Sequence, residues 1–261
     1  MNEIKTGEAI LAKNIKGIFF DLYGTLLIFH NMHEAWSKWF LKFYESLKKF
    51  GLKSSQNDVK GKLEGFFSRS DTPVQNDGLT LYERRIRRQC IDLGLELGKK
   101  EYQEIANTSV RTWHSYMILD PEVIPLLEKL NERYKLALVS NFDHPPHIYS
   151  VLSELNLKKY FQSIVISGEV GYKKPDPKIF TLALNYVRLH PHEVIHVGDT
   201  QADVEGANAA GVYSIHIKRD DMILISDYKK SVVDLKTSEK SPIINSQMTI
   251  KRLSELLEVL P

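Results

Sequence analysis

Short apolar runs recur along the chain and predict the strands of a buried parallel sheet. They consist largely of aliphatic, β-branched and aromatic residues without a polar residue at every second position, which is typical of strands covered on both faces. The runs are GIFFD (17–21), KLALVSN (135–141), SIVIS (163–167), VIHVGD (194–199) and VYSIHI (212–217).

Segments with a helical period lie between the later runs. Residues 122–134 place aliphatic side chains on one helical face, and residues 147–157 and 176–189 follow the same period. Strand and helix in repeated alternation predict βαβ units, in which neighbouring strands run parallel. We therefore expect an α/β fold whose core is a Rossmann-like parallel sheet.

The segment between the first and second runs has a different pattern. It contains no strand-like run, and its apolar residues recur with the period of a helix. The predicted helices cover residues 34–51, 81–98 and 101–117, with a loop at 68–78 between the first two.

This change of pattern predicts two domains. We expect residues 30–117 to form an all-helical cap domain, inserted into a Rossmann-like core made of residues 1–29 and 118–261. Near the end of the chain we expect an irregular stretch at 226–241, a short strand at 242–245 and a helix at 251–260.

Composition excludes several classes of protein. The net charge of +2 is too small for the concentrated basic face of a nucleic-acid-binding protein. The single cysteine, Cys90, cannot form an internal disulfide. No apolar run approaches the ~18 residues of a membrane span, and the N-terminus lacks the apolar core of a signal peptide. We expect a cytoplasmic protein with no nucleic-acid or membrane partner.

Side chains capable of chemistry follow four of the predicted strands at their carboxyl ends. Asp21 ends the first strand and Ser140 ends the second. Lys174 follows the third strand and Asp199 ends the fourth. Because ligands of open parallel sheets bind at this edge, we expect the four side chains to converge on one site.

The residue types at these positions fit phosphoryl transfer. A carboxylate such as Asp21 can attack phosphorus and form an aspartyl-phosphate. Because the carboxylate and the phosphoryl group are both negative, the reaction needs cations, which Lys174 and a divalent metal would supply. Asp199 and Asp203 flank a short turn and offer the oxygen ligands that Mg²⁺ prefers.

Simpler structural roles stay open for some of these residues. Asp21 also fits a turn at a strand end, Asp203 fits the first turn of a helix as a capping acid, and Lys173 competes with Lys174 for the same role. We expect the remaining polar clusters to be structural: Arg84, Arg87 and Arg88 as a solvated helix face, and His30, His33, His144 and His147 as surface or packing residues.

The first strand leads into a tight turn at Gly24 and Thr25, whose backbone N–H groups can approach an anion. This segment, D-L-Y-G-T from Asp21 to Thr25, resembles the first motif of the haloacid dehalogenase-like superfamily of hydrolases. The resemblance implies that Asp21 is the nucleophile and that Gly24 and Thr25 bind the substrate. It also implies that Asp21 and the carbonyl oxygen of Tyr23 bind magnesium.

The later signals resemble the other motifs of the same superfamily. Ser140, in VSNFD, matches the residue that hydrogen-bonds the phosphoryl group, and Asn141 next to it is expected to bind substrate. Lys174 precedes Pro-Asp-Pro, as the superfamily's lysine does, and the resemblance implies that it neutralises the nucleophile and the phosphoryl group. Asp199 and Asp203, in HVGDTQAD, match the acidic motif that holds magnesium.

Tyr23 departs from the pattern of the phosphatases in this superfamily. Those enzymes usually have a second aspartate two residues after the nucleophile, which serves as general acid and base. A phenol, with an ordinary pKa near ~10, is a poorer proton donor at neutral pH. Tyrosine at this position is similar to the true haloacid dehalogenases, which use no metal, whereas the Asp199 and Asp203 pair favours a metal-dependent enzyme.

These observations predict a magnesium-dependent phosphatase that hydrolyses a small phosphomonoester, with Asp21, Tyr23, Ser140 and Lys174 as its catalytic residues. The alternatives are a metal-free 2-haloacid dehalogenase and a non-catalytic, phosphate-binding scaffold. The sequence leaves the physiological substrate and the oligomeric state open.

Overall fold

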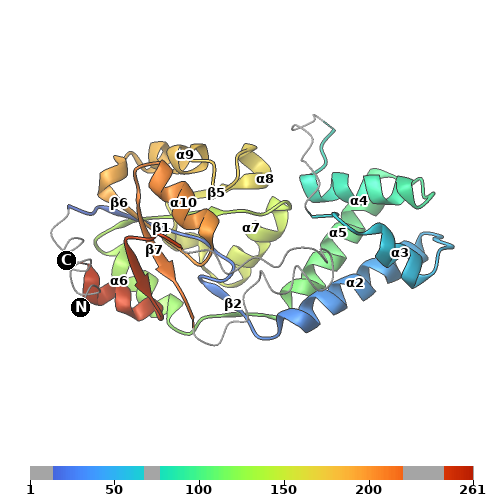
Figure 1. Ribbon diagram of the computed structural model, residues 1–261, viewed down its shortest axis with the longest axis horizontal. Helices are drawn as coiled ribbons and strands as arrows, with labels where there is room; N and C mark the ends of the chain where they lie inside the picture. Colours follow the sequence, from blue (N-terminus) through green and yellow to red (C-terminus); the bar gives the residue numbers. More distant parts are fainter. Residues whose placement is uncertain (1–13, 68–76, 220–243, 261) are drawn as a thin grey trace.

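The core of the protein is a six-stranded parallel sheet with the order β5-β4-β1-β6-β7-β8 (Figure 1). The computed structural model describes residues 14–67, 77–219 and 244–260. None of the helices in these three ranges is both long and apolar enough to cross a membrane. Five strands confirm the apolar runs, and β8 completes one edge. The strands are β1 (Gly17–Phe20), β4 (Lys135–Ser140), β5 (Ser163–Ile166), β6 (Val194–Gly198), β7 (Tyr213–Ile217) and β8 (Met248–Ile250).

Helices cover both faces of the sheet, because its strands bury side chains on both sides. In β1, Ile18 and Phe20 belong to one apolar cluster and Phe19 belongs to another. Helices α6, α7 and α12 cover the first face, and α9 and α10 cover the second (Figure 1). This arrangement confirms the expected α/β fold. The helices span α6 Val123–Asn131, α7 Pro145–Glu154, α9 Lys178–Val187, α10 Gln201–Ala209 and α12 Leu256–Val259.

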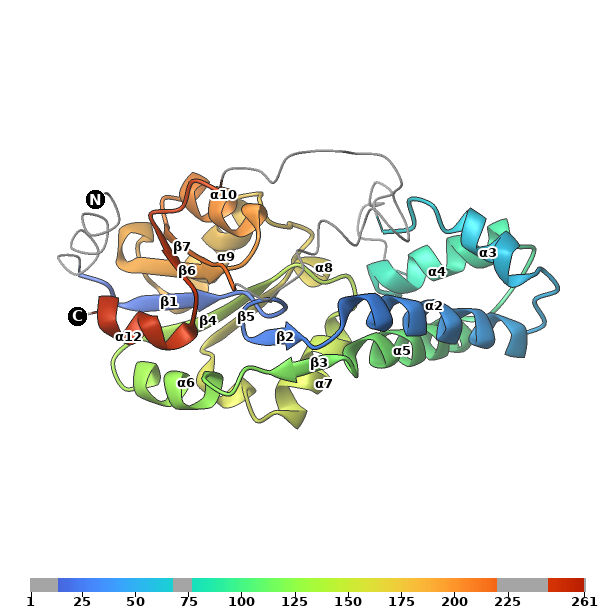
Figure 2. The same cartoon turned by 60° about the horizontal axis from the view of Figure 1, so that its bottom comes forward.

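A group of helices beyond one end of the sheet has an apolar core of its own (Figure 2). Aromatic rings make up much of this core, and those of Trp39 and Phe43 stack with 5.3 Å between their centroids. One of its helices begins at a capping box, in which the side chains of Thr80 and Glu83 each accept a backbone N–H of the other residue. The helices are α2 (Met32–Lys49), α3 (Gln56–Lys62), α4 (Leu81–Asp92) and α5 (Lys99–His114).

A short antiparallel ladder joins this helical group to the sheet. Strand β2 (Leu27–Phe29) pairs with β3 (Met117–Leu119), so the chain enters and leaves the helices at adjacent positions (Figure 2). The expectation of no strand between residues 30 and 118 is therefore wrong at Met117. A run of three residues is too short to show a period, and it forms a strand because a partner is available.

Several boundaries differ from those expected. Helix α4 ends at Asp92 because Gly94 takes a φ of +76°, which stops the helix. Helix α7 starts at Pro145, because proline is tolerated in a first turn whose N–H groups have no partner within the helix. The strand expected at 242–245 is absent at 244–245, the two residues of that stretch which are described, and β8 follows instead. The irregular stretch at 226–241 and most of the loop at 68–78 lie outside the described residues. The remaining elements are α8 (Ser167–Val170) and the 3₁₀ turns η1 (Lys158–Tyr160), η2 (Pro191–Glu193) and η3 (Leu253–Glu255).

Candidate active site

Three carboxylates meet at the carboxyl edge of the sheet. Strands β1 and β6 are neighbours, so Asp21 after β1 and Asp199 after β6 leave the sheet side by side. Asp203 joins them from the first turn of α10. Each of the three offers a carboxylate oxygen, and these oxygens lie within 4.8 Å of one another. The expected convergence of these acids is therefore a feature of the fold.

Lys174 reaches into this acidic cluster from the loop between α8 and α9. Its Nζ lies 2.6 Å from Asp21 Oδ1 and 2.5 Å from Asp203 Oδ1, and it donates to the carbonyl oxygen of Val139 at 3.0 Å. These three contacts use the full donor capacity of an ammonium group. Lys174 is only 4% exposed, whereas Lys173 is exposed. Of the two lysines that the sequence offered for this role, Lys174 is therefore the one that contacts the acidic cluster.

Asn141 holds the backbone of Lys174 in place. Its Nδ2 donates to the carbonyl oxygen of Lys174 at 2.9 Å, and its Oδ1 accepts the backbone N–H of Lys174 at 2.8 Å. Because Asn141 directly follows β4, this pair of hydrogen bonds ties the lysine loop to the end of the sheet. The side chain of Asn141 therefore positions Lys174, a role that the sequence did not indicate.

Asp203 is at once a helix cap and a member of the acidic cluster. Its Oδ2 accepts hydrogen bonds from the backbone N–H of Thr200 at 3.1 Å and from Thr200 Oγ1 at 2.5 Å, which forms a capping box at the start of α10. Its Oδ1 accepts from Lys174 and also lies 2.9 Å from Nε2 of the buried His196. Both oxygens of Asp203 are thus already bound by protein donors.

The charges of the cluster are strongly coupled. Burial raises the pKa of Asp21 to about 6, although Lys174 opposes the shift. Burial and the charges of Asp21 and Asp203 raise the pKa of Asp199 well above its ordinary value. Burial also acts against ionised Asp203, but Lys174 and His196 outweigh it and lower the pKa of that carboxyl. One ammonium group therefore does not balance three carboxylates.

The residues around Asp199 fit a divalent cation. Oδ1 of Asp199 is buried and has no hydrogen-bond partner among the described residues. Gly24 has a φ of +89°, and a Cβ at this position would lie 2.1 Å from Asp199 Oδ2. Only glycine permits this approach of the turn to the carboxylate. A hard cation with oxygen ligands suits such a group of carboxylates, and Asp21 and Asp199 have the oxygens to hold it.

Ser140 and Thr25 are buried beside this cluster. Ser140 is the last residue of β4 and is 1% exposed. Thr25 is fully buried, and its Oγ1 has no hydrogen-bond partner within the described part of the chain. Its carbonyl oxygen accepts a hydrogen bond from Arg219 at 2.8 Å, and Arg219 also pairs with Asp120. The turn after β1 is thereby anchored to the segment that follows β3.

The side chain of Tyr23 lies between the sheet edge and the helical group. Its ring stacks on Phe142 with 5.3 Å between the centroids and meets Trp113 edge-on at 5.0 Å. Its hydroxyl oxygen lies 3.2 Å from Nδ1 of His114 on α5. Burial, and then the charge of Asp21, raise the pKa of Tyr23 above its ordinary value. The phenol is therefore a poor proton donor at neutral pH.

The structure corrects the expectation of a solvated arginine face on α4. Arg84 is 8% exposed and pairs with Asp77 at 3.2 Å. Arg85, which the periodicity did not single out, is also buried and pairs with Asp143 beyond β4. Arg88 is exposed as expected, with Asp92 at 3.2 Å. Because Arg85 is on α4 and Asp143 follows the sheet, their ion pair joins the helical group to the core.

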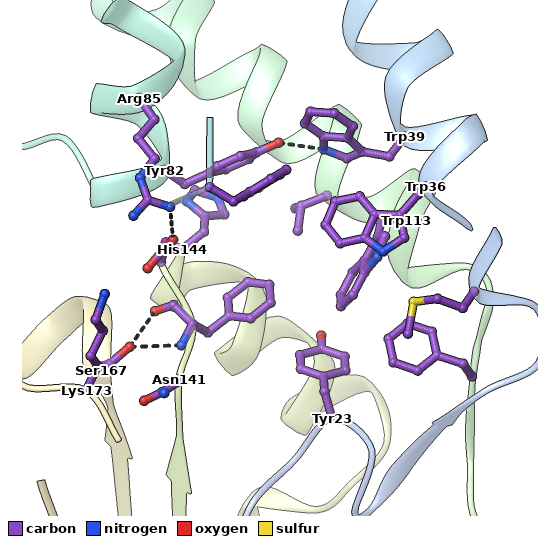
Figure 3. Close-up of a pocket in the computed structure, with 16 residues that line it drawn as sticks. Tyr23, Trp36, Trp39, Tyr82, Arg85, Trp113, Asn141, His144, Ser167 and Lys173 are labelled. Carbon is purple, nitrogen blue, oxygen red and sulfur yellow. Dashed lines mark hydrogen bonds and ion pairs between the residues drawn. The ribbon is translucent and has the colours of Figure 1, made fainter. Parts of the chain in front are cut away.

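A cavity of about 340 Å³ opens between the helices and the sheet edge (Figure 3). Tyr23 and Asn141 contribute to its wall from the core, while Trp36 and Tyr82 contribute from the helices. Volumes of this order are typical of sites for small molecules. The cavity thus adjoins the residues that position Lys174.

Comparison with known proteins identifies the family. The model for the haloacid dehalogenase-like hydrolases matches residues 15–211, which is most of the chain. The chain therefore belongs to the haloacid dehalogenase-like hydrolase family.

Individual relatives match smaller parts of the sequence. A glyceraldehyde 3-phosphate phosphatase of Methanopyrus kandleri is 36% identical over 110 residues, which are 41% of this chain and 47% of that protein. The chain spans less than half the length of this relative and of the next relatives that it matches.

Solved structures confirm the fold. A HAD phosphatase from Thermococcus onnurineus has a TM-score of 0.61 at 22% identity, over 94% of this chain and 97% of that one. A 2-haloacid dehalogenase from Pseudomonas syringae has a TM-score of 0.60, with the same identity and coverage. Because a phosphatase and a dehalogenase fit equally well, the fold alone does not separate the two reactions.

Proposed function

We propose that this protein is a magnesium-dependent phosphatase that hydrolyses a small phosphomonoester through an aspartyl-phosphate on Asp21. The observation that carries the proposal is the buried cluster in which Lys174 binds both Asp21 and Asp203 while Asp199 remains beside them. A dianionic phosphate ester needs positive charge at the nucleophile, which Lys174 and a divalent cation held by the carboxylates would supply together. The phosphatase name of a sequence relative supports the same reaction.

In the proposed reaction, an oxygen of Asp21 attacks phosphorus as the bond to the alcohol oxygen breaks. Lys174 holds Oδ1 of Asp21, which orients the carboxylate and balances charge as the phosphoryl group arrives. Ser140 and the backbone N–H groups around Gly24 and Thr25 bind the phosphoryl oxygens. The departing alcohol oxygen takes a proton from solvent water. A water molecule then attacks phosphorus, the bond between phosphorus and the Asp21 oxygen breaks, and the proton of the attacking water returns to solvent, which releases phosphate and restores the Asp21 carboxylate.

A magnesium ion would be held by Asp21, Asp199 and the carbonyl oxygen of Tyr23. When bound, it would supply positive charge to the phosphoryl oxygens. Asp203 would act mainly through Lys174 and through any water on the ion, because both of its oxygens already accept protein hydrogen bonds. Asp199, rather than Asp203, would therefore be the second carboxylate that holds the ion.

We further propose that residues 30–117 act as a cap domain on a catalytic core of residues 1–29 and 118–261. Their separate apolar core supports this division, as does the β2–β3 ladder at which the chain enters and leaves. A cap above the sheet edge can exclude bulk water during reaction and select the alcohol part of the substrate.

A 2-haloacid dehalogenase remains the second candidate, and Tyr23 is the residue that favours it. In that reaction Asp21 would attack carbon and displace a halide. The cluster of Asp21, Asp199 and Asp203 favours the phosphatase, because a reaction without a metal gains nothing from two further carboxylates beside its nucleophile.

The deciding experiment compares two products in wild type and Asp21→Asn. Phosphate release from p-nitrophenyl phosphate with Mg²⁺, abolished by a chelator and by Asp21→Asn, is expected. Asp92→Asn is the matched control, because this exposed carboxylate lies on α4 and should leave the rate unchanged. Chloride release from 2-chloropropionate without metal would favour the dehalogenase. A folded Asp21→Asn protein with more than a few per cent of activity would contradict the nucleophile assignment.

A further inference from the structure

The cavity between the helices and the sheet edge is lined mainly by aromatic rings. Half of its lining residues are aromatic, and all three tryptophans of the chain are among them. The rings of Trp36 lie 5.7 Å from those of both Trp39 and Trp113, measured between centroids. Tyr23 closes the cavity on the side of the first motif, with its ring directed toward these tryptophans (Figure 3).

Two polar side chains of this wall, Tyr82 and His144, are already hydrogen-bonded within the protein. The hydroxyl of Tyr82 accepts from Trp39 Nε1 at 2.7 Å and lies 2.8 Å from Ser109 Oγ. His144 is placed between Thr80 Oγ1 and Asn107 Oδ1, at 3.0 Å from each. Tyr82 and His144 therefore have little capacity left for the hydroxyl groups of a ligand, and each hydroxyl left unpaired beside them would lose affinity.

Three ionisable residues of the wall, Arg85, Asp143 and His144, are likewise of limited use to a charged or polar ligand. Arg85 is paired with Asp143, so its guanidinium is engaged within the protein. Burial lowers the pKa of His144 to about 4, which keeps its ring neutral at physiological pH. Arg85 and Asp143 thus neutralise each other and His144 is neutral, so the exposed Lys173 carries the remaining charge among the lining residues.

Trp113 adds a further aromatic surface to the wall and holds a polar group without a partner. It lines the cavity, and its Nε1 is buried with no hydrogen-bond partner among the described residues. An unpartnered indole N–H is stabilised by a single acceptor or by the π face of an aromatic ring. An aromatic group in the cavity would pack against the ring of Trp113 and the neighbouring rings.

We propose that the alcohol part of the substrate is an apolar, aromatic group that occupies this cavity. The inference rests on the proposed phosphatase activity and names the class of substrate: phosphomonoesters of aryl-alkyl alcohols, in preference to phosphorylated sugars and other polyols. A cavity of about 340 Å³ accommodates one or two fused rings. Tyr23 then contacts the ligand with its ring, which gives the tyrosine of the first motif a role in specificity.

Binding can be tested without catalysis. Because Trp36, Trp39 and Trp113 all line the cavity, intrinsic fluorescence reports its occupation. Saturable quenching by 2-phenylethanol is expected at concentrations at which glycerol has no effect. Trp36→Ala should weaken this binding at least about 10-fold, as expected when a ligand ring loses a stacking partner. Leu41→Ala is the matched control, because Leu41 is on the same helix and 40% exposed. Absence of quenching by 2-phenylethanol would overturn the inference.

Turnover provides the second arm. 2-Phenylethyl phosphate and glycerol 1-phosphate are both primary alkyl esters, so their leaving groups have similar reactivity. We expect kcat/KM to favour 2-phenylethyl phosphate by at least about 10-fold, with the preference reduced in Trp36→Ala and retained in Trp36→Phe. Equal kcat/KM values would refute the inference and leave the phosphatase proposal intact. Quenching by 2-phenylethanol without hydrolysis of either ester would support the aromatic site and refute the phosphatase proposal.

Discussion

Replacing Lys174 by methionine removes the one ammonium group that the structure places among Asp21, Asp199 and Asp203. Methionine keeps a side chain of similar length but donates no hydrogen bond. Asp21 Oδ1 and Asp203 Oδ1 each lose a contact of 2.6 Å or less, and the carbonyl oxygen of Val139 loses its donor. We expect the variant to be inactive and less stable than wild type.

The expected loss follows from the burial of this ion pair. Removing one partner of a buried salt bridge typically costs ~3–5 kcal/mol, because the remaining charge is left without compensation. Lys174 has two carboxylate partners, so we expect a value of about 4–5 kcal/mol at pH 8. The loss should shrink in acid, since the pKa of Asp21, about 6 beside Lys174, rises further when the lysine is absent. A carboxyl whose pKa is raised in the folded state destabilises that state fully above the raised pKa, and the penalty fades as the pH falls toward the unfolded pKa near ~4.

Urea unfolding of the metal-free proteins at pH 8 and pH 5 measures this effect. The difference between wild type and Lys174→Met should narrow by at least about 1 kcal/mol at the lower pH. Lys173→Met is the matched control: this exposed lysine is adjacent in sequence, and its loss should change stability by less than about 1 kcal/mol. A loss below 1 kcal/mol in Lys174→Met, or a loss that does not depend on pH, would refute this account of the cluster.

Two further substitutions probe the junction between the helices and the sheet. Tyr23→Phe keeps the ring contacts and loses the contact between the hydroxyl and His114. If the phenol is not the proton donor, kcat should stay within about 2-fold of wild type. A kcat reduced about 10-fold or more would show that the phenol donates the proton. The second substitution is His147→Phe. Burial, and then the nearby His114, lower the pKa of His147 to about 3. Below about pH 6.5 the unfolded chain therefore binds a proton at His147 that the folded protein does not bind. Wild type should therefore lose about 2 kcal/mol more stability than His147→Phe between pH 7.5 and pH 5 in urea titrations, and equal losses would rule out His147 as the cause.

The sheet could be predicted because its signal is local. Each run such as GIFFD or KLALVS carries enough β-branched and aromatic residues to indicate a strand on its own, and the structure places strands at 17–20 and 135–140. Strands β2 and β3 could not be predicted in this way. Each has three residues, and each exists because the other is available as a partner. Their pairing depends on chain entry and exit points that only the folded helices bring together.

The site shows the same division between local and long-range information. The convergence of Asp21, Asp199 and Lys174 follows from strand order, because acids and bases at the carboxyl ends of parallel strands meet at one edge. The role of Asn141 was not predictable, because its hydrogen bonds run to the backbone of Lys174, 33 positions away. The role of His196 was not predictable either. It lies inside a strand, and only the folded structure brings its Nε2 next to Asp203.

Asp203 shows why two readings of one residue need not exclude each other. The sequence permits a helix cap or a member of the charged site, and each oxygen of the carboxylate serves one of these roles. The cap fixes the start of α10, and α10 follows β6, so the position of Asp203 relative to Asp199 is set by the same few residues that begin the helix. Lys174, bound to Asp203, then takes its place beside Asp21. The position of the Asp21 carboxylate thus depends on the N-terminus of α10. A substitution of Thr200 that weakens the cap should displace Asp203 and Lys174, and so weaken the contact of Lys174 with Asp21.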